Sequence, residues 1–158
     1  MSPSLHPNLE RLAWLVGTWR GRGAGEYPTI DDFGYVEEIA FGHVGKPFLS
    51  YVQRTRDSTS NLPLHAEAGY IRVGDSGELE LVIAQPSGIV ELHEGVLDDR
   101  TLTFRATGVH VTATAKSVTD VLRTLTVSGD ELRYEVSMAA VGLPLTHHLA
   151  ATLERSTD

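Results

Sequence analysis

The chain has 158 residues, of which 41% are hydrophobic and 22% charged, a composition typical of one globular domain rather than of a disordered segment. Thirteen Lys and Arg against 21 Asp and Glu give a net charge of −8 at pH 7, which disfavours binding to nucleic acid or to an anionic membrane surface. The absence of cysteine excludes disulfide scaffolds, iron–sulfur clusters and thiol nucleophiles. There is no signal-peptide pattern and no apolar run approaches the roughly 18 residues of a membrane span, so we expect one cytoplasmic domain over residues 1–158.

Only one segment, close to the N-terminus, has the pattern of a helix. Pro7 stands where a first helical turn tolerates proline, and Leu9 and Leu12 follow at helical spacing. Gly17 then ends the run. We therefore predict a short helix over residues 7–15.

The rest of the chain predicts strands. Apolar and polar residues alternate, β-branched and aromatic residues are frequent, and turn signals rich in Gly, Pro, Asp and Ser separate the runs. The runs number about ten, at a spacing of roughly 8–14 residues. They include residues 48–56, 66–73, 78–84, 90–97, 102–107 and 132–138.

An all-β, antiparallel up-and-down barrel of about ten strands accounts best for this pattern. Closing the sheet removes its exposed edges. A barrel of this size encloses more space than its own side chains fill. We therefore expect an internal cavity suited to a small apolar molecule.

A glycine-rich stretch follows the predicted helix, with Gly17, Trp19, Gly21 and Gly23 at alternating positions. It is not a phosphate-binding loop, because no Lys-Ser/Thr pair follows it. Glycine at these positions favours a bent strand that another backbone approaches closely. We expect Trp19 to plug the closed end of the barrel with its indole N–H bonded to backbone.

Two histidine patterns are candidates for chemistry. Glu91 and His93 lie two apart and so share one strand face, but a metal site there would need a third ligand from elsewhere. His147 and His148 are adjacent, so in a regular strand one of them faces the cavity. An imidazole in an apolar cavity needs a partner, and a bound metal centre is one such partner.

Other chemistries have little support. There is no Gly-x-Ser-x-Gly elbow for a serine nucleophile. The carboxylate pairs Asp31–Asp32 and Glu37–Glu38 predict solvated turns and strand edges. Covalent haem attachment needs cysteine, whereas non-covalent haem needs only one good axial ligand and an apolar slot.

Three stretches together resemble nitrobindin, a haem-binding member of the fatty-acid-binding-protein-like barrels. Residues 17–23 match the family's Gly-x-Trp-x-Gly-x-Gly signature in full, and the Tyr-Pro-Thr of residues 27–29 follows it. Val-Gly-Lys-Pro at residues 44–47 is the second stretch. Pro-Leu-Thr-His-His-Leu at residues 144–149 resembles the family's Pro-x-Thr-x-His-Leu. The resemblance extends over residues 7–155.

The resemblance implies a ten-stranded barrel with one b-type haem per chain, mostly ferric, in a pocket that solvent can reach. By the same match, His148 is the axial ligand of the iron and carries the catalytic role. Thr29 and Lys116 match positions that contact the haem. The implied function is binding of nitric oxide and isomerisation of peroxynitrite to nitrate, with these small molecules as the partners of a monomer or homodimer.

Strand alternation raises a difficulty for His148. In a regular strand it shares a face with Thr146 and Ala150, whereas His147 shares the more apolar face that includes Leu149. A bulge after Pro144 could switch the faces. Alternatively, the face with the smaller residues is the haem side. His147 therefore remains the rival ligand.

Three other functions stay open from the sequence. The main alternative is a non-catalytic carrier of a fatty acid or another apolar ligand. Such carriers hold a carboxylate through buried arginine and tyrosine, but Arg133 and Tyr134 alternate faces and form no visible cluster. The protein could also be a nitric oxide sensor without turnover, or a family member that has lost its haem, although the presence of His148 argues against that loss.

Overall fold

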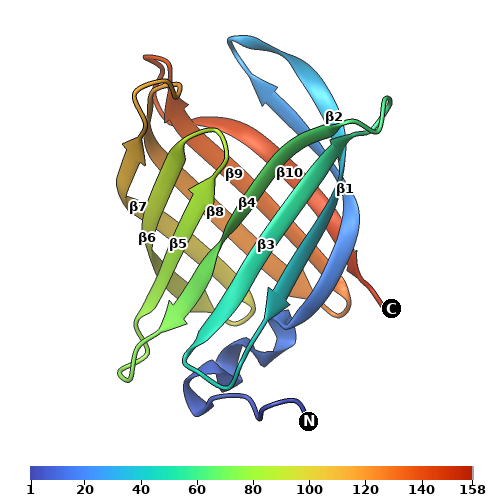
Figure 1. The fold of residues 1–158 in the computed structure, drawn as a ribbon, viewed down its shortest axis with the longest axis vertical. Helices are drawn as coiled ribbons and strands as arrows, with labels where there is room; N and C mark the ends of the chain where they lie inside the picture. The colour runs from blue at the N-terminus through green and yellow to red at the C-terminus, as the bar shows by residue number, and fades with distance from the viewer. Residues whose placement is uncertain (158) are drawn as a thin grey trace.

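The computed structural model describes residues 1–157 as a closed ten-stranded antiparallel barrel with one short helix, which confirms the predicted fold class (Figure 1). Neighbouring strands follow the chain, and the pairing of β1 with β10 closes the barrel. No helix among the described residues is long and apolar enough to cross a membrane. The elements are η1 (Pro7–Leu15), β1 (Gly17–Tyr27), β2 (Ile30–Gly42), β3 (Phe48–Asp57), β4 (Pro63–Val73), β5 (Leu79–Gln85), β6 (Ile89–Asp98), β7 (Thr101–Val111), β8 (Val118–Ser128), β9 (Glu131–Ala140) and β10 (Thr146–Arg155).

The predicted helix over residues 7–15 is confirmed as the 3₁₀ helix η1, which lies across one end of the barrel (Figure 1). The ring nitrogen Nδ1 of His6 caps it by accepting the backbone N–H of Asn8 at 3.2 Å. Leu9, Leu12 and Leu15 are fully buried. The helix therefore closes this end with its apolar side.

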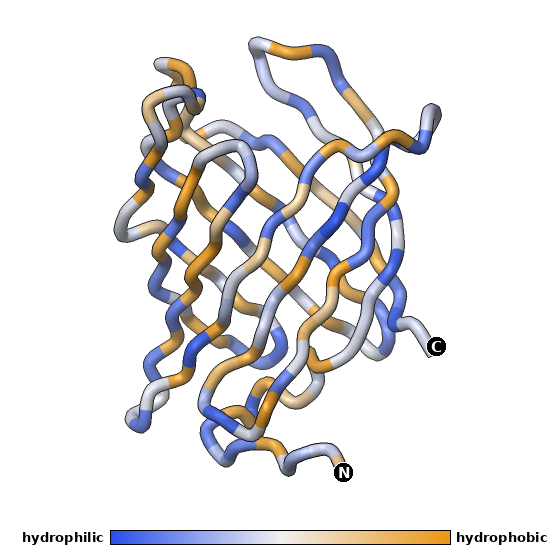
Figure 2. The backbone as a smooth tube through the Cα atoms, viewed as in Figure 1, coloured by the Kyte–Doolittle hydropathy of each residue, from blue (hydrophilic) through white to orange (hydrophobic). Residues whose placement is uncertain are grey.

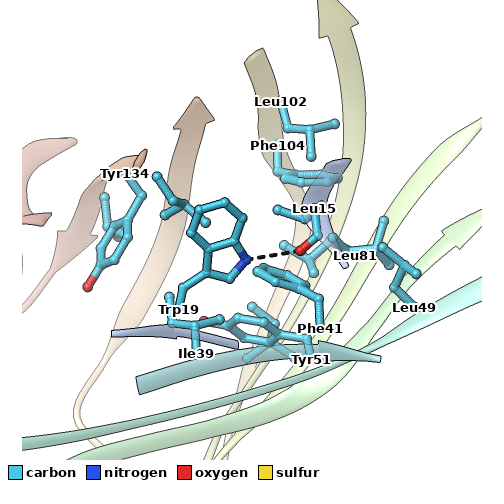
Figure 3. Close-up of a cluster of buried hydrophobic side chains, with 14 of the residues drawn as sticks. Leu15, Trp19, Ile39, Phe41, Leu49, Tyr51, Leu81, Leu102, Phe104 and Tyr134 are labelled. Carbon is cyan, nitrogen blue, oxygen red and sulfur yellow. Dashed lines mark hydrogen bonds between the residues drawn. The ribbon is translucent and has the colours of Figure 1, made fainter. Parts of the chain in front are cut away.

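Trp19 plugs the same end, as the sequence predicts. Its side chain is fully buried, and its indole N–H donates to the carbonyl of Leu15 at 3.0 Å (Figure 3). The guanidinium of Arg155 lies 4.2 Å from the centre of the indole ring and also donates to the carbonyl groups of Trp14 and Val16. Through these contacts Arg155 links β10 to Trp19 and to the C-terminal end of η1.

The glycines of β1 make room for two kinds of neighbour. A Cβ at Gly21 would lie 2.1 Å from the backbone oxygen of Thr152, which confirms the close backbone approach predicted for this stretch. A Cβ at Gly23 would lie 2.2 Å from the ring of Tyr35. The ring of Tyr35 in β2 therefore lies directly over β1, where it forms part of the wall of the barrel's more open end.

The strands show the alternation expected of a filled barrel, with hydrophobic and hydrophilic residues following one another along the tube (Figure 2). The most buried side chains gather at the end that η1 covers. The ladder between β7 and β8 runs only from the pair Thr101–Thr126 to the pair Arg105–Leu122, although β7 continues to Val111 beside β6. The opposite end of the barrel is consequently the more open one.

Candidate functional site

A cavity of about 750 Å³ occupies the end of the barrel opposite η1. The hairpin turns between β1 and β2, between β5 and β6 and between β7 and β8 surround its mouth (Figure 1). Its volume lies within the range of about 300–1,000 Å³ common for cofactor and small-molecule sites. We call it the outer cavity.

A bulge in β10 turns His148 toward the outer cavity. His147 pairs with Ser137 and Leu149 pairs with Val136, so His148 is the extra residue between two successive pairs of the β9–β10 ladder. His148 and Leu149 both line the cavity, whereas His147 does not. Of the two solutions that the sequence left open, the bulge is the one that the structure contains.

The imidazole of His148 is fixed through one nitrogen. Its Nδ1 lies 3.0 Å from the backbone carbonyl of Glu26, which can only accept, so Nδ1 carries the proton and donates it. The rings of Tyr27 and Phe33 lie edge-on to it, with centroids 5.6 and 6.4 Å away. Burial lowers the pKa of His148 below its ordinary value, so the ring is neutral at pH 7 and Nε2 keeps its lone pair.

The other two predicted contact residues lie at the mouth of the same cavity. Thr29 belongs to the turn between β1 and β2, and Lys116 to the loop between β7 and β8. Both side chains are exposed and both line the outer cavity. The structure thus brings Thr29, Lys116 and His148 to one cavity from three distant parts of the chain.

The floor of the outer cavity is charged, which the sequence did not predict. Arg123 of β8 makes two bonds of 2.8 Å to Glu67 of β4, and bonds of 2.8 and 3.0 Å to Glu91 of β6. The two carboxylates are 4% and 1% exposed. Burial by itself would raise the pKa of Glu67 and Glu91, but the guanidinium outweighs it and holds both pKa values below the ordinary range. We call this buried Glu67–Arg123–Glu91 group the crossbar.

Further side chains complete the hydrogen bonding of the crossbar carboxylates. Tyr51 donates to one oxygen of Glu67 at 2.9 Å, and Nε2 of His65 lies 3.4 Å from the other. Gln85 donates to one oxygen of Glu91, and Nε2 of His93 lies 2.8 Å from the other. Every oxygen of the two carboxylates therefore has at least two polar neighbours, as buried charges require.

Glu91 and His93 share a face, as predicted from their spacing, but they face the interior as part of this network. Residues 1–157 contain no group of three or more His, Cys, Asp or Glu side chains that could hold a metal ion. His93 is itself fully enclosed, with its Nδ1 buried and without a hydrogen-bond partner. Glu91 is therefore a member of the crossbar, and His93 is a hydrogen-bonding neighbour of its carboxylate.

The prediction that Glu37 is solvated is wrong. It is 5% exposed and accepts hydrogen bonds from the hydroxyl of Tyr134, at 2.8 Å, and from the amide of Gln53. Burial raises its pKa from 4.5 to about 7. The adjacent Glu38 does face outward, where it pairs with Arg20 at 2.8 Å. The sequence does contain a sign of this burial. Side chains two apart in a strand share a face, and Glu37 lies between Tyr35 and Ile39, which are both buried.

A similar signal was available for Arg123, but not for Glu91. Arg123 shares its face of β8 with Val121, which belongs to the core cluster, and with Leu125, which packs against that cluster. On β6 the pattern is inverted, because Val90 and Leu92 face outward while Glu91 and His93 are buried. Hydropathy alone therefore assigns the faces of β6 the wrong way round.

The fold and this site together define a β-barrel whose deep, open-ended cavity holds a neutral, oriented imidazole, which suits a prosthetic group ligated by histidine. Residues 8–155 match the family model of the THAP4-like, heme-binding beta-barrel domain, and the chain belongs to that family. The resemblance found in the three sequence motifs is thereby confirmed.

Relatives and a solved structure agree with this assignment. The chain is 51% identical over 161 residues to a protein named peroxynitrite isomerase 2 from Mycobacterium ulcerans, covering 99% of this chain and 100% of that one. It is 51% identical over 158 residues to the peroxynitrite isomerase of Nocardia farcinica, covering 98% and 94% of the two chains. The crystal structure of Rv2717c from M. tuberculosis superposes with a TM-score of 0.88 at 46% identity, covering 97% of this chain and 99% of that chain.

Proposed function

We propose that this protein holds one haem b through His148 and isomerises peroxynitrite to nitrate. The observation that carries the proposal is the His148 imidazole on the wall of the outer cavity, with Nδ1 bonded to the Glu26 carbonyl and Nε2 left with its lone pair. A metal-bound histidine in proteins commonly has its second nitrogen oriented in this way. The names of the relatives supply the reaction.

The residues of the cavity fit the group. The volume of about 750 Å³ suits a cofactor of this size class, and the ring of His148 is neutral at pH 7, as ligation requires. Lys116 and Thr29 at the mouth supply an ammonium group and a hydroxyl group for the anionic substituents of a porphyrin. We propose these two side chains as the peripheral haem contacts.

When bound through His148, haem would supply a Lewis-acidic iron for the rearrangement of peroxynitrite to nitrate. The chain's own residues provide the setting. The Glu26 carbonyl holds the proton on Nδ1 of His148, and the rings of Tyr27 and Phe33 flank the imidazole. Lys116 places a cation at the mouth, where it attracts an anionic substrate toward a chain whose net charge is −8.

The structure weakens the alternative of a fatty-acid carrier. Arg133 is exposed on the outer face, whereas Tyr134 points inward, so the two form no carboxylate-binding pair. The buried arginine that does exist, Arg123, already binds two carboxylates of the protein. A fatty-acid headgroup would find no unpaired cation on this floor.

Two measurements test the proposal. Haemin added to the apoprotein should give a Soret band that saturates at one haem per chain, and peroxynitrite mixed with holoprotein should decay at a rate proportional to its concentration, with nitrate as the product. His148→Ala should abolish both, and the matched variant His147→Ala should keep both. A lack of haem uptake contradicts the proposal as a whole. Haem and nitric oxide binding without faster decay would instead identify a sensor.

A further inference from the structure

The crossbar lies at the boundary between two spaces inside the barrel. Arg123 and Gln53 line the outer cavity, and both also line a second cavity of about 50 Å³ on the side of the plugged end. We call this second space the inner chamber. Its remaining wall is mainly apolar and includes Ile39, Phe41, Ile71, Leu81, Ile83 and Phe104.

The crossbar reaches across the lumen rather than along one wall. Arg123 belongs to β8, Glu67 to β4 and Glu91 to β6, and β4 is four strands away from β8 around a ring of ten. The guanidinium bonds to all four carboxylate oxygens. A planar, multiply bonded group thus occupies the passage from the outer cavity to the inner chamber.

Moving this group aside is costly. If Arg123 swings away, two buried carboxylates lose their counter-ion, and uncompensated buried charge is strongly destabilising. A chain-like ligand that entered the barrel head first would also bring its own carboxylate against Glu67 and Glu91. A flat, wide ligand does not meet this obstacle, because it can fill the outer cavity alone.

We propose that the Glu67–Arg123–Glu91 crossbar determines the ligand specificity of the barrel. It confines bound molecules to the outer cavity and keeps the end of a long acyl chain out of the inner chamber. This inference concerns the barrel's own interior and does not depend on the haem proposal.

The test removes the crossbar without leaving unpaired charge. In the variant E67Q/E91Q/R123M the two glutamines keep hydrogen-bonding groups for their neighbours, and methionine replaces the guanidinium with a flexible apolar side chain. The apoprotein is titrated with a fluorescent long-chain polyene fatty acid. We expect the variant to bind this probe at least about tenfold more tightly than the wild type.

The matched control removes the same types of group from the outer surface. Arg72 and Glu80 form an exposed ion pair of 2.7 Å between β4 and β5, and R72M/E80Q should bind the probe no better than the wild type. A folded triple variant that binds the probe no better than the wild type overturns the proposal.

If the triple variant does not fold, methyl NMR on the wild-type apoprotein decides the question. The fatty acid should leave the methyl signals of Ile39, Ile71 and Ile83 in place, whether or not it shifts those of Ile89 and Met138 in the outer cavity. Shifts of the inner-chamber methyl groups contradict the proposal. Because every measurement uses apoprotein, its outcome and that of the haem experiments can be told apart.

Discussion

Glu37 should make the stability of the apoprotein fall as pH rises, and Glu37→Gln should remove this effect. Its pKa is 4.5 in an ordinary setting and about 7 in the folded barrel, a difference of about 2.5. At about 1.36 kcal/mol for each pKa unit, the difference corresponds to about 3 kcal/mol. Because the folded state binds the proton more tightly, this stabilisation is complete below pH 4.5 and is lost as pH rises through about 7.

The assay is urea unfolding of both proteins at several pH values. The free energy of unfolding of Glu37→Gln relative to the wild type should rise by about 3 kcal/mol between about pH 4 and pH 8. Other titrating groups are common to both proteins and cancel in the difference. Glu38→Gln is the matched control, since it removes the next carboxylate of β2 from the exposed outer face. Parallel pH profiles for Glu37→Gln and the wild type would refute the reasoning.

Three further predictions concern the crossbar, the glycines of β1 and the binding of haem. Arg123→Met alone leaves two buried carboxylates without a cation and should lower the free energy of unfolding in urea by about 3–5 kcal/mol, more than E67Q/E91Q/R123M does. Equal losses of stability in the two variants would contradict the pairing of Arg123 with the carboxylates. Gly23→Ala puts a methyl group 2.2 Å from the ring of Tyr35 and should lower the free energy of unfolding by about 1–3 kcal/mol in the same assay. Unchanged stability would mean that the Tyr35 ring moves aside at no cost. Haem affinity should fall to half of its high-pH value only below pH 6.5, because burial lowers the pKa of His148 from its ordinary 6.5. A spectrophotometric titration in which the affinity is already halved above pH 6.5 would contradict this.

The barrel could be predicted because alternation along one strand is a local property of the sequence. The run Glu131–Ala140, for example, alternates in hydropathy and forms β9 with buried residues at alternate positions over most of its length. Trp19 could be placed for a similar reason, since it follows the one helix found in residues 1–157 and lies between Gly17 and Gly21 of β1. Features that need only short-range information were therefore within reach.

The side of β10 from which His148 projects was not within reach of the sequence alone. A one-residue bulge inverts the faces, and its position depends on the register with β9, which no local pattern records. The motif resemblance selected His148 where alternation favoured His147. A match to related sequences carries the register implicitly, which is why it selected the histidine that lines the outer cavity.

The crossbar was missed for a different reason. Glu67, Glu91 and Arg123 are far apart in sequence, and each of them taken alone is expected to be exposed to solvent. They become stable inside only because three strands bring them together as mutual partners. Burial of charge is a property of the assembled barrel, so a search of single strands does not find it.

We expect His148, rather than His147, to donate its nitrogen to the haem iron. Resonance Raman spectroscopy of the ferrous haem complex measures the iron–imidazole stretching band directly. The band should be present in the wild type and in His147→Ala, absent in His148→Ala, and restored to that variant by added imidazole. A band that survives in His148→Ala without imidazole and disappears in His147→Ala would contradict the account.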